Sequence, residues 1–173
     1  APGIRDLRLT ARVIHHLLLS HGLAVERFRG QGRRGSIGIT NANTSYEPAD
    51  ASEECRIACE RARDFDTRLW HGPVYGRGYP ASVVAHYESH DAPFPIEDGD
   101  MGRIAAPTDF LGVNLYSRAR IESEPGRSLG FRPAKPTLPL TPMGYEKAPF
   151  ALGDFVRFVS AEYGRPAIYV TEN

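Results

Sequence analysis

The chain has 173 residues, of which 41% are hydrophobic and 24% charged, a composition typical of a soluble globular protein of one domain at most. Lys and Arg together number 21, and so do Asp and Glu, so the net charge gives no bias toward nucleic acid or an anionic membrane. No apolar run approaches the roughly 20 residues that a membrane-spanning helix needs.

The first residues and the two cysteines bear on cellular location. Ala1-Pro2-Gly3 lacks the features of a signal peptide and is typical of a cut or processed end. Cys55 and Cys59 lie four positions apart in a helical pattern, where a disulfide would be strained and where two thiols alone make a poor zinc site. We therefore expect reduced, partly buried thiols, a cytoplasmic protein, and neither a metal nor another cofactor.

A long helix is predicted over residues 4–28, because apolar side chains recur there at about 3.6-residue spacing. It contains His15, His16 and His21, which could form a metal or catalytic cluster. Adjacent histidines point about 100° apart on a helix, so we favour a structural hydrogen bond over a metal site. The predicted apolar stripe consists of Leu7, Ile14, Leu17, Leu18, Val25 and Phe28.

A short strand is predicted over residues 36–40, where isoleucines alternate with smaller residues. Residues 41–45 are polar, and we expect them to form a loop at the exit of this strand. Asn43 lies in that loop, where an Asn commonly takes part in a turn.

A helix should follow, with Asp50 or Ser52 as its cap, and run to about Trp70. Residues 71–80 are dense in Gly, Pro and aromatic side chains and predict an irregular loop. Residues 81–89 then predict a further helix.

Two features in the middle of the chain could be taken for binding sites. Trp70, Tyr75 and Tyr79 could stack on a sugar, but aromatic residues packed by Pro and Gly are more often loop anchors. Residues 91–100 are acidic, but they lack the alternating carboxylates of a calcium loop, so we interpret them as a solvated loop.

A second strand is predicted over residues 109–118. It is apolar at first, with Gly112 allowing close approach of a neighbouring backbone, and becomes polar at Asn114 and Tyr116. Residues 118–149 contain repeated prolines and little apolar periodicity, so we expect a long ordered loop, of a kind that is usually functional.

The chain ends with a helix predicted over residues 151–163 and a buried parallel strand predicted over residues 167–170. Glu172 follows directly, at the end of a strand, where barrel enzymes keep their catalytic groups. If this strand lies parallel to the strand before it, Asn114 and Tyr116 reach the same end of the sheet. Glu172 is thus the first candidate for chemistry.

Asp-Phe-Leu-Gly-Val-Asn-Leu-Tyr at residues 109–116 and Tyr-Val-Thr-Glu-Asn at residues 169–173 resemble glycoside hydrolase family one, the retaining β-glucosidases and their relatives. Residues 15–25, 36–48, 71–80 and 141–146 also resemble family segments. The resemblance implies an α/β fold, the (β/α)8 TIM barrel. It also implies that residues 1–173 supply only a part of this domain, about strands five to seven with their flanking helices.

The resemblance implies retaining hydrolysis of terminal β-D-glucosyl residues, as in cellulose degradation, through a covalent glycosyl-enzyme intermediate. Glu172 matches the nucleophile, and Tyr116 matches the phenol that orients it. Asn114 and Asn43 match residues of the sugar cleft. Tyr145 stands where the family normally has Trp as a wall of the leaving-group subsite.

The acid/base Glu of the family lies in an Asn-Glu-Pro motif, which does not occur in this sequence. The isolated chain should therefore lack turnover and depend on the remaining barrel segments of a parent polypeptide. The expected partner is a β-glucoside or oligosaccharide, with no role for nucleic acid or a membrane. Two alternatives stay open: a non-catalytic carbohydrate-binding or scaffold protein on the same fold, and another barrel in which Glu172 is merely a strand-end carboxylate.

Overall fold

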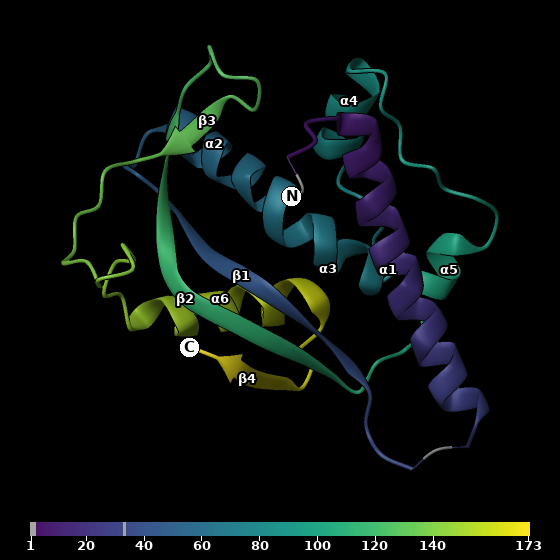
Figure 1. Ribbon diagram of the computed structural model, residues 1–173. Helices are drawn as coiled ribbons and strands as arrows, with labels where there is room; N and C mark the ends of the chain where they lie inside the picture. Colours follow the sequence, from purple (N-terminus) through teal and green to yellow (C-terminus); the bar gives the residue numbers. More distant parts are fainter. Residues whose placement is uncertain (1–2, 33) are drawn as a thin grey trace. The chain divides into compact units, whose positions relative to one another are not determined.

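The computed structural model describes residues 3–32 and 34–173, so the expected processed end at Ala1-Pro2 lies outside the described residues. The chain divides into two compact units (Figure 1). The helical unit contains the residues up to Ile37 together with Arg68–Thr108, and the sheet unit contains Gly38–Thr67 and Asp109–Asn173. No helix in the described part of the chain is long and apolar enough to cross a membrane.

The helices of the helical unit are α1 (Leu7–Gly30), α3 (Leu69–Val74), α4 (Ala81–Ser89) and α5 (Asp100–Ile104). α1 begins at Leu7, three residues later than predicted. Asp6 caps it, since its side chain accepts a hydrogen bond from the Leu9 N–H at 3.0 Å. α4 has the predicted bounds. α1 and α5 approach closely at Gly22, where an added Cβ would lie 2.2 Å from the carbonyl oxygen of Arg103.

The buried face of α1 differs from the predicted apolar stripe. Leu7 and Leu17 are exposed, which corrects two of the predicted core positions. The contact face instead includes two small residues and one histidine, which a hydrophobicity pattern does not detect. The buried residues of this helix are Ala11, Ile14, His15, Leu18, Gly22 and Val25.

His15 has the structural role that the sequence predicted. It is fully buried, with Nδ1 2.9 Å from the hydroxyl of Tyr79 and Nε2 3.0 Å from Oδ2 of Asp100. The hydrogen bond with His15, together with one from the Glu97 N–H, lowers the pKa of Asp100. The ring of Tyr79 stacks on Phe94 with 4.2 Å between centroids, so Tyr79 is a loop anchor, as favoured from the sequence.

The sheet unit is built on β2 (Phe110–Ser123), which lies at the centre of its sheet (Figure 1). β1 (Gly38–Pro48) and β4 (Ile168–Glu172) pair with β2 on its two sides, and both are parallel to it. β3 (Phe131–Pro133) pairs with the end of β2 in the antiparallel direction. The predicted parallel arrangement of the terminal strand and the strand before it is confirmed.

Two of the predicted loops are wrong in part because the strands are longer than their apolar segments. β1 continues through residues 41–45, and β2 continues beyond Arg118 to Ser123, where β3 pairs with it. The main-chain hydrogen bonds of a ladder do not depend on side-chain polarity, so a polar sequence can remain a strand once a neighbouring strand pairs with it.

α2 (Glu53–Arg63) and α6 (Phe150–Tyr163) contact the sheet and complete its core. Ser52 caps α2, as predicted, with Oγ 3.3 Å from the Cys55 N–H nitrogen. The helix predicted to run to about Trp70 is helical over that range, as α2, a π-helical turn η1 (Asp64–Arg68) and α3 in succession. α3 continues to Val74 and so replaces the start of the loop predicted over residues 71–80. Cys55 and Cys59 are free thiols, as expected, and both are buried.

β4 is exposed, although the sequence predicted a buried strand. Tyr169 is 58% exposed and Val170 49% exposed. In the described part of the chain β4 pairs with β2 alone, so it forms the edge of the sheet. It also extends to Glu172, which therefore lies within the strand and not beyond it.

Candidate active site

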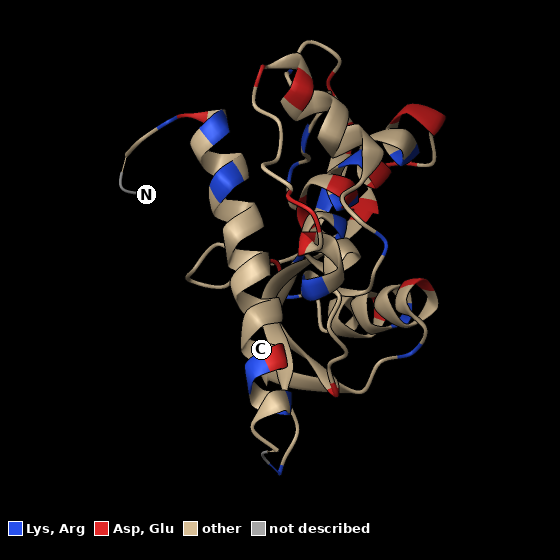
Figure 2. Ribbon diagram, turned by 90° about the vertical axis from the view of Figure 1, so that its right-hand side faces the viewer, with Lys and Arg blue, Asp and Glu red and all other residues tan. Residues whose placement is uncertain are grey.

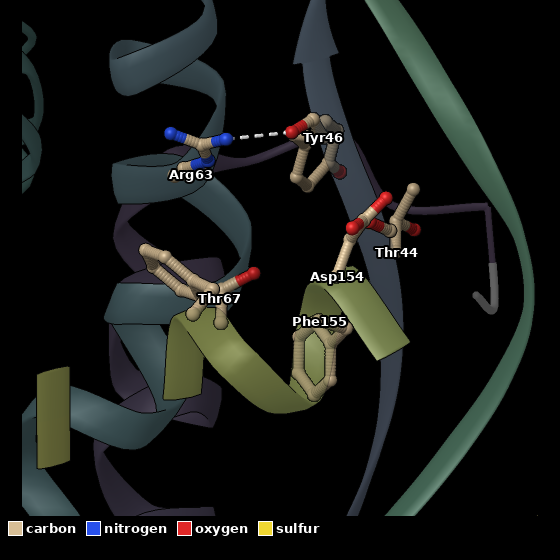
Figure 3. A pocket seen from close by; sticks show the side chains of 8 residues that line it. Thr44, Tyr46, Arg63, Thr67, Asp154 and Phe155 are labelled. Carbon is tan, nitrogen blue, oxygen red and sulfur yellow. Dashed lines mark hydrogen bonds between the residues drawn. The ribbon is translucent and has the colours of Figure 1, made fainter. Parts of the chain in front are cut away.

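Two hollows in the sheet unit do not contain the predicted site residues. A cavity of about 40 Å³, room for about one water molecule, lies between β1 and α6 (Figure 3), where Arg63 Nη2 donates a hydrogen bond to the carbonyl oxygen of Tyr46 at 2.7 Å. An open groove of about 420 Å³ runs between α2 and the turn that joins β2 to β3.

The pairing of β2 with β4 brings Glu172 next to Asn114. Val113 pairs with Val170, and the next pair is Asn114 with Glu172, so Thr171 is an extra residue on β4. Such an irregularity changes the direction in which the following side chains point. Thr171 Oγ1 donates a hydrogen bond to Oδ1 of Asn114 at 2.6 Å, which ties the irregular step to β2.

A second irregularity lies on the β1 side of the same strand. Between Leu115 and Arg118, β2 places two residues, Tyr116 and Ser117, opposite the single Thr44 of β1. Both ladders of β2 therefore change register within a few residues of one another, where the predicted site residues gather.

Tyr116 and Glu172 are joined directly. The hydroxyl of Tyr116 donates a hydrogen bond to Oε2 of Glu172. This hydrogen bond raises the pKa of Tyr116, and partial desolvation together with the charge of Glu172 adds to the effect. The phenol therefore stays protonated and keeps its donor on a carboxylate that is open to an incoming group.

Tyr145 extends this arrangement. Its ring lies nearly parallel to that of Tyr116, with 5.8 Å between centroids and 13° between planes. The predicted residues Glu172, Tyr116, Asn114 and Tyr145 thus form one group at the end of β4, beside the middle of β2.

Asn43 lies apart from this group. It is almost buried on β1, pairs with Leu115, and donates from Nδ2 to the carbonyl oxygen of Asn41 at 2.6 Å. It lies one strand further along the sheet than Asn114, and within a strand, so a turn does not explain its side chain.

A cluster of charged side chains next to the site was not predicted from the sequence. Arg118 pairs with Glu47 and, through Nε at 2.8 Å, with Oε2 of Glu146. Oε1 of Glu146 accepts hydrogen bonds from the backbone N–H groups of Thr137 and Leu138, at 2.5 and 2.9 Å. The sequence contains Arg118 in a predicted strand and Glu146 in a predicted loop, but nothing in the sequence indicates that these two residues pair.

Glu146 is unsuited to donate a proton. Desolvation by itself would raise the pKa of Glu146, but the hydrogen bond and charge of Arg118 and the two backbone donors outweigh it and lower the pKa to about 2. Glu146 is thus held as a charged partner of Arg118. In the part of the chain that the structure describes, no group of three or more His, Cys, Asp or Glu side chains could hold a metal ion.

Charges of both signs lie side by side along the chain (Figure 2). Many are ion pairs, such as Arg132 with Glu122 at 2.7 Å and Arg127 with Glu124 at 2.7 Å. This distribution agrees with the formal net charge of zero.

Curated proteins that are similar to this chain are β-glucosidases. The chain is 36% identical over 177 residues to "Beta-glucosidase A" of Acetivibrio thermocellus and 34% identical over 174 residues to "Beta-glucosidase A" of Thermotoga maritima. Both alignments cover 100% of this chain and 39% of the relative, so the chain spans about two fifths of the length of these proteins.

Solved structures agree. A β-glucosidase from Exiguobacterium marinum superposes with a TM-score of 0.92 at 33% identity, covering 100% of this chain and 40% of that one. The Thermotoga maritima family 1 glycoside hydrolase in complex with a cyclophellitol analogue gives a TM-score of 0.89 at 32% identity, covering 100% and 39%. The predicted fold class is confirmed, since the chain forms part of a TIM barrel. Residues 1–173 match the model of glycosyl hydrolase family 1 along their whole length, and the chain belongs to that family.

Proposed function

We propose that residues 1–173 form part of the barrel domain of a retaining β-glucosidase that hydrolyses terminal β-D-glucosyl residues. The observation that carries this proposal is the hydrogen bond from the hydroxyl of Tyr116 to Glu172, at the end of a parallel sheet and beside the ring of Tyr145. A carboxylate oriented by a donor and open to solvent on its other side is suited to nucleophilic attack.

In this mechanism the Glu172 carboxylate attacks the anomeric carbon while the bond to the leaving oxygen breaks, which gives a covalent glycosyl-enzyme. A second carboxyl group, about 5 to 5.5 Å from the first in retaining enzymes, protonates the leaving oxygen and then activates water. Glu146 cannot serve, because its ion pair keeps it charged. We infer that the remaining barrel segments supply this group.

The substrate is a β-glucoside or oligosaccharide, as in the breakdown of cellulose. Structures of the Thermotoga maritima relative with castanospermine and with a glucoimidazole support a sugar-binding cleft in the family. Asn114 and Asn43 are proposed to line that cleft, and Tyr145 to form a wall for the leaving group. The buried Cys55 and Cys59 are not joined in a disulfide, and we infer a cytoplasmic location from this.

The test uses the full-length protein that contains these residues. Incubation with 2-deoxy-2-fluoroglucosyl fluoride should add one fluoroglucosyl mass to the peptide that contains Glu172. Glu172→Gln should abolish this label and lower kcat/KM on 4-nitrophenyl β-glucoside by roughly 10⁴-fold or more.

Glu124→Gln serves as the control, because Glu124 is partly exposed and pairs with Arg127 away from the site, and it should leave kcat/KM unchanged. Full turnover in Glu172→Gln, or a label on another peptide, would overturn the assignment of the nucleophile. Sugar binding without turnover by the unmodified protein would favour a non-catalytic carbohydrate-binding protein instead.

A further inference from the structure

We propose that Glu146 is a positioning residue for the leaving-group side of the candidate active site. It anchors the segment that carries Tyr145, and it thereby fixes the stack of Tyr145 on Tyr116 next to Glu172. This inference rests on the proposed function and adds a determinant of substrate preference to it.

The segment around Tyr145 is a tight hairpin turn. Gly144 N–H donates to the carbonyl oxygen of Thr141 at 2.9 Å, and Thr141 N–H donates to that of Tyr145 at 2.7 Å. Pro142 suits the second position of such a turn, and Gly144 has the positive φ of 83° that the residue before Tyr145 requires. The turn thus fixes Tyr145 relative to its own short hairpin, but not relative to β2.

Glu146 makes the connection to β2. Its carboxylate binds Arg118 of β2, and its backbone oxygen accepts a hydrogen bond from Oγ of Ser117 at 3.0 Å. The other carboxylate oxygen accepts from the backbone N–H groups of Thr137 and Leu138, on the incoming side of the same segment. One side chain therefore joins both ends of the hairpin segment to the strand that carries Tyr116.

The ion pair beside Tyr145 is buried, since the side chains of Glu146 and Arg118 are only 7% and 9% exposed. Because Glu146 is the next residue along the chain, this ion pair holds the backbone of Tyr145 in a fixed position relative to β2. Because Ser117 and Arg118 directly follow Tyr116 on β2, the same contacts relate both rings to Glu172.

This arrangement predicts an effect that depends on the leaving group. An aromatic leaving group can contact the ring of Tyr145, whereas fluoride is too small to do so. In the full-length protein, Glu146→Gln should lower kcat/KM on 4-nitrophenyl β-glucoside by about tenfold or more, because a misplacement of about 1 Å can cost up to about 100-fold. On β-glucosyl fluoride the same variant should change kcat/KM by less than about threefold.

Four further variants, one of them a double variant, make the test decisive. Tyr145→Ala should give the same difference between the two substrates. The double variant Glu146→Gln/Tyr145→Ala should have a kcat/KM no lower than that of the less active single variant, because both changes remove the same contact between the Tyr145 ring and the leaving group. Arg118→Lys keeps the charge but loses the fork of donors, and it should give an intermediate effect even if Glu146→Gln folds poorly. Glu124→Gln should behave as the unmodified protein.

The outcomes separate the two proposals. An equal loss on both substrates, or no loss on either, in folded Glu146→Gln and Arg118→Lys would overturn the positioning role while Glu172 remained the nucleophile. Absence of glucose release from either substrate by the unmodified protein would instead overturn the proposed function, and the positioning role with it.

Discussion

Tyr116 links the parts of the candidate active site at the scale of single residues. Its hydroxyl donates to Glu172, and its ring stacks on Tyr145. The two residues that follow it, Ser117 and Arg118, hold Glu146. A change at any of these side chains is therefore expected to alter the position of the Glu172 carboxylate.

The sequence predicted the grouping of Glu172, Tyr116 and Asn114 from the polar residues that follow two apolar segments expected to be parallel strands. The grouping is observed because β4 pairs with β2 at Asn114, although β2 continues past these residues to Ser123. It did not predict the role of Glu146. The partners of this carboxylate lie in β1, in β2 and in a loop, and neither periodicity nor spacing relates residues so far apart along the chain.

His71 gives a prediction about pH. It is fully buried, and burial lowers its pKa from 6.5 to about 4. The unfolded chain therefore takes up a proton at higher pH than the folded chain. The free energy of unfolding should have its full value above pH 6.5 and decrease by about 3 kcal/mol as the pH falls from 6.5 to 4.

Denaturant unfolding of the full-length protein at several pH values would measure this decrease. In His71→Gln the free energy of unfolding should depend much less on pH between 6.5 and 4, whatever the stability of this variant at neutral pH. His90→Gln, at an exposed position at the end of α4, should retain it. A slope that is the same in His71→Gln and in the unmodified protein would contradict the assignment.

β2 determines the arrangement of the sheet unit at the scale of secondary structure. Its Gly112 was predicted to allow close approach of a neighbouring backbone, and the structure confirms this. A Cβ at Gly112 would lie 2.1 Å from Oγ1 and 3.1 Å from Cα of Thr40 on β1. The pairing of β1 and β2 beside the site therefore depends on the absence of a side chain there.

We expect Gly112→Ala to lower the free energy of unfolding by about 1 to 3 kcal/mol, because Thr40 would have to move. Gly102→Ala is the matched control. Gly102 lies exposed in α5, with nothing within 4 Å of an added Cβ, so this change should raise stability by about 0.5 to 1 kcal/mol. Thermal unfolding of both variants would measure the difference, and equal effects would contradict the close-approach explanation.

The lengths of the elements show where sequence patterns succeed. The helix over residues 81–89 was predicted with its observed bounds, since a proline precedes it and its apolar residues share a face. β1 was predicted too short, because Asn41 to Ser45 are polar and the pairing that makes them a strand comes from β2. When a strand is stabilised by pairing with a segment far away in the sequence, its own residues need not show a strand pattern.

At the scale of the whole molecule, the chain covers about two fifths of the length of its relatives. The exposed side chains of Tyr169 and Val170 on β4 lie at the edge of the described sheet. Edge strands with exposed apolar residues tend to pair with other chains.

We therefore expect the 173-residue chain, produced alone, to associate with itself as its concentration rises, and to release no glucose from 4-nitrophenyl β-glucoside. Light scattering after size-exclusion chromatography would measure the association. Val170→Lys, which adds a charge to the edge strand, should reduce it. If the isolated chain stayed monomeric at all concentrations, or released glucose, it would not need the remaining barrel segments for stability or for catalysis, which would contradict the proposal.

The order of the strands in the sheet also has a consequence for how the protein is made. Leu111 of β2 lies against Ile39 on one side and Ile168 on the other, so both pairings join residues far apart in the chain. Such contacts form slowly, because a long loop must close before any of them is gained. A ribosome produces β1 first, β2 after four intervening α-helices, and β4 last. Tyr116 consequently leaves the ribosome long before Glu172 does, and the hydrogen bond between them is among the last contacts of this chain to form during synthesis.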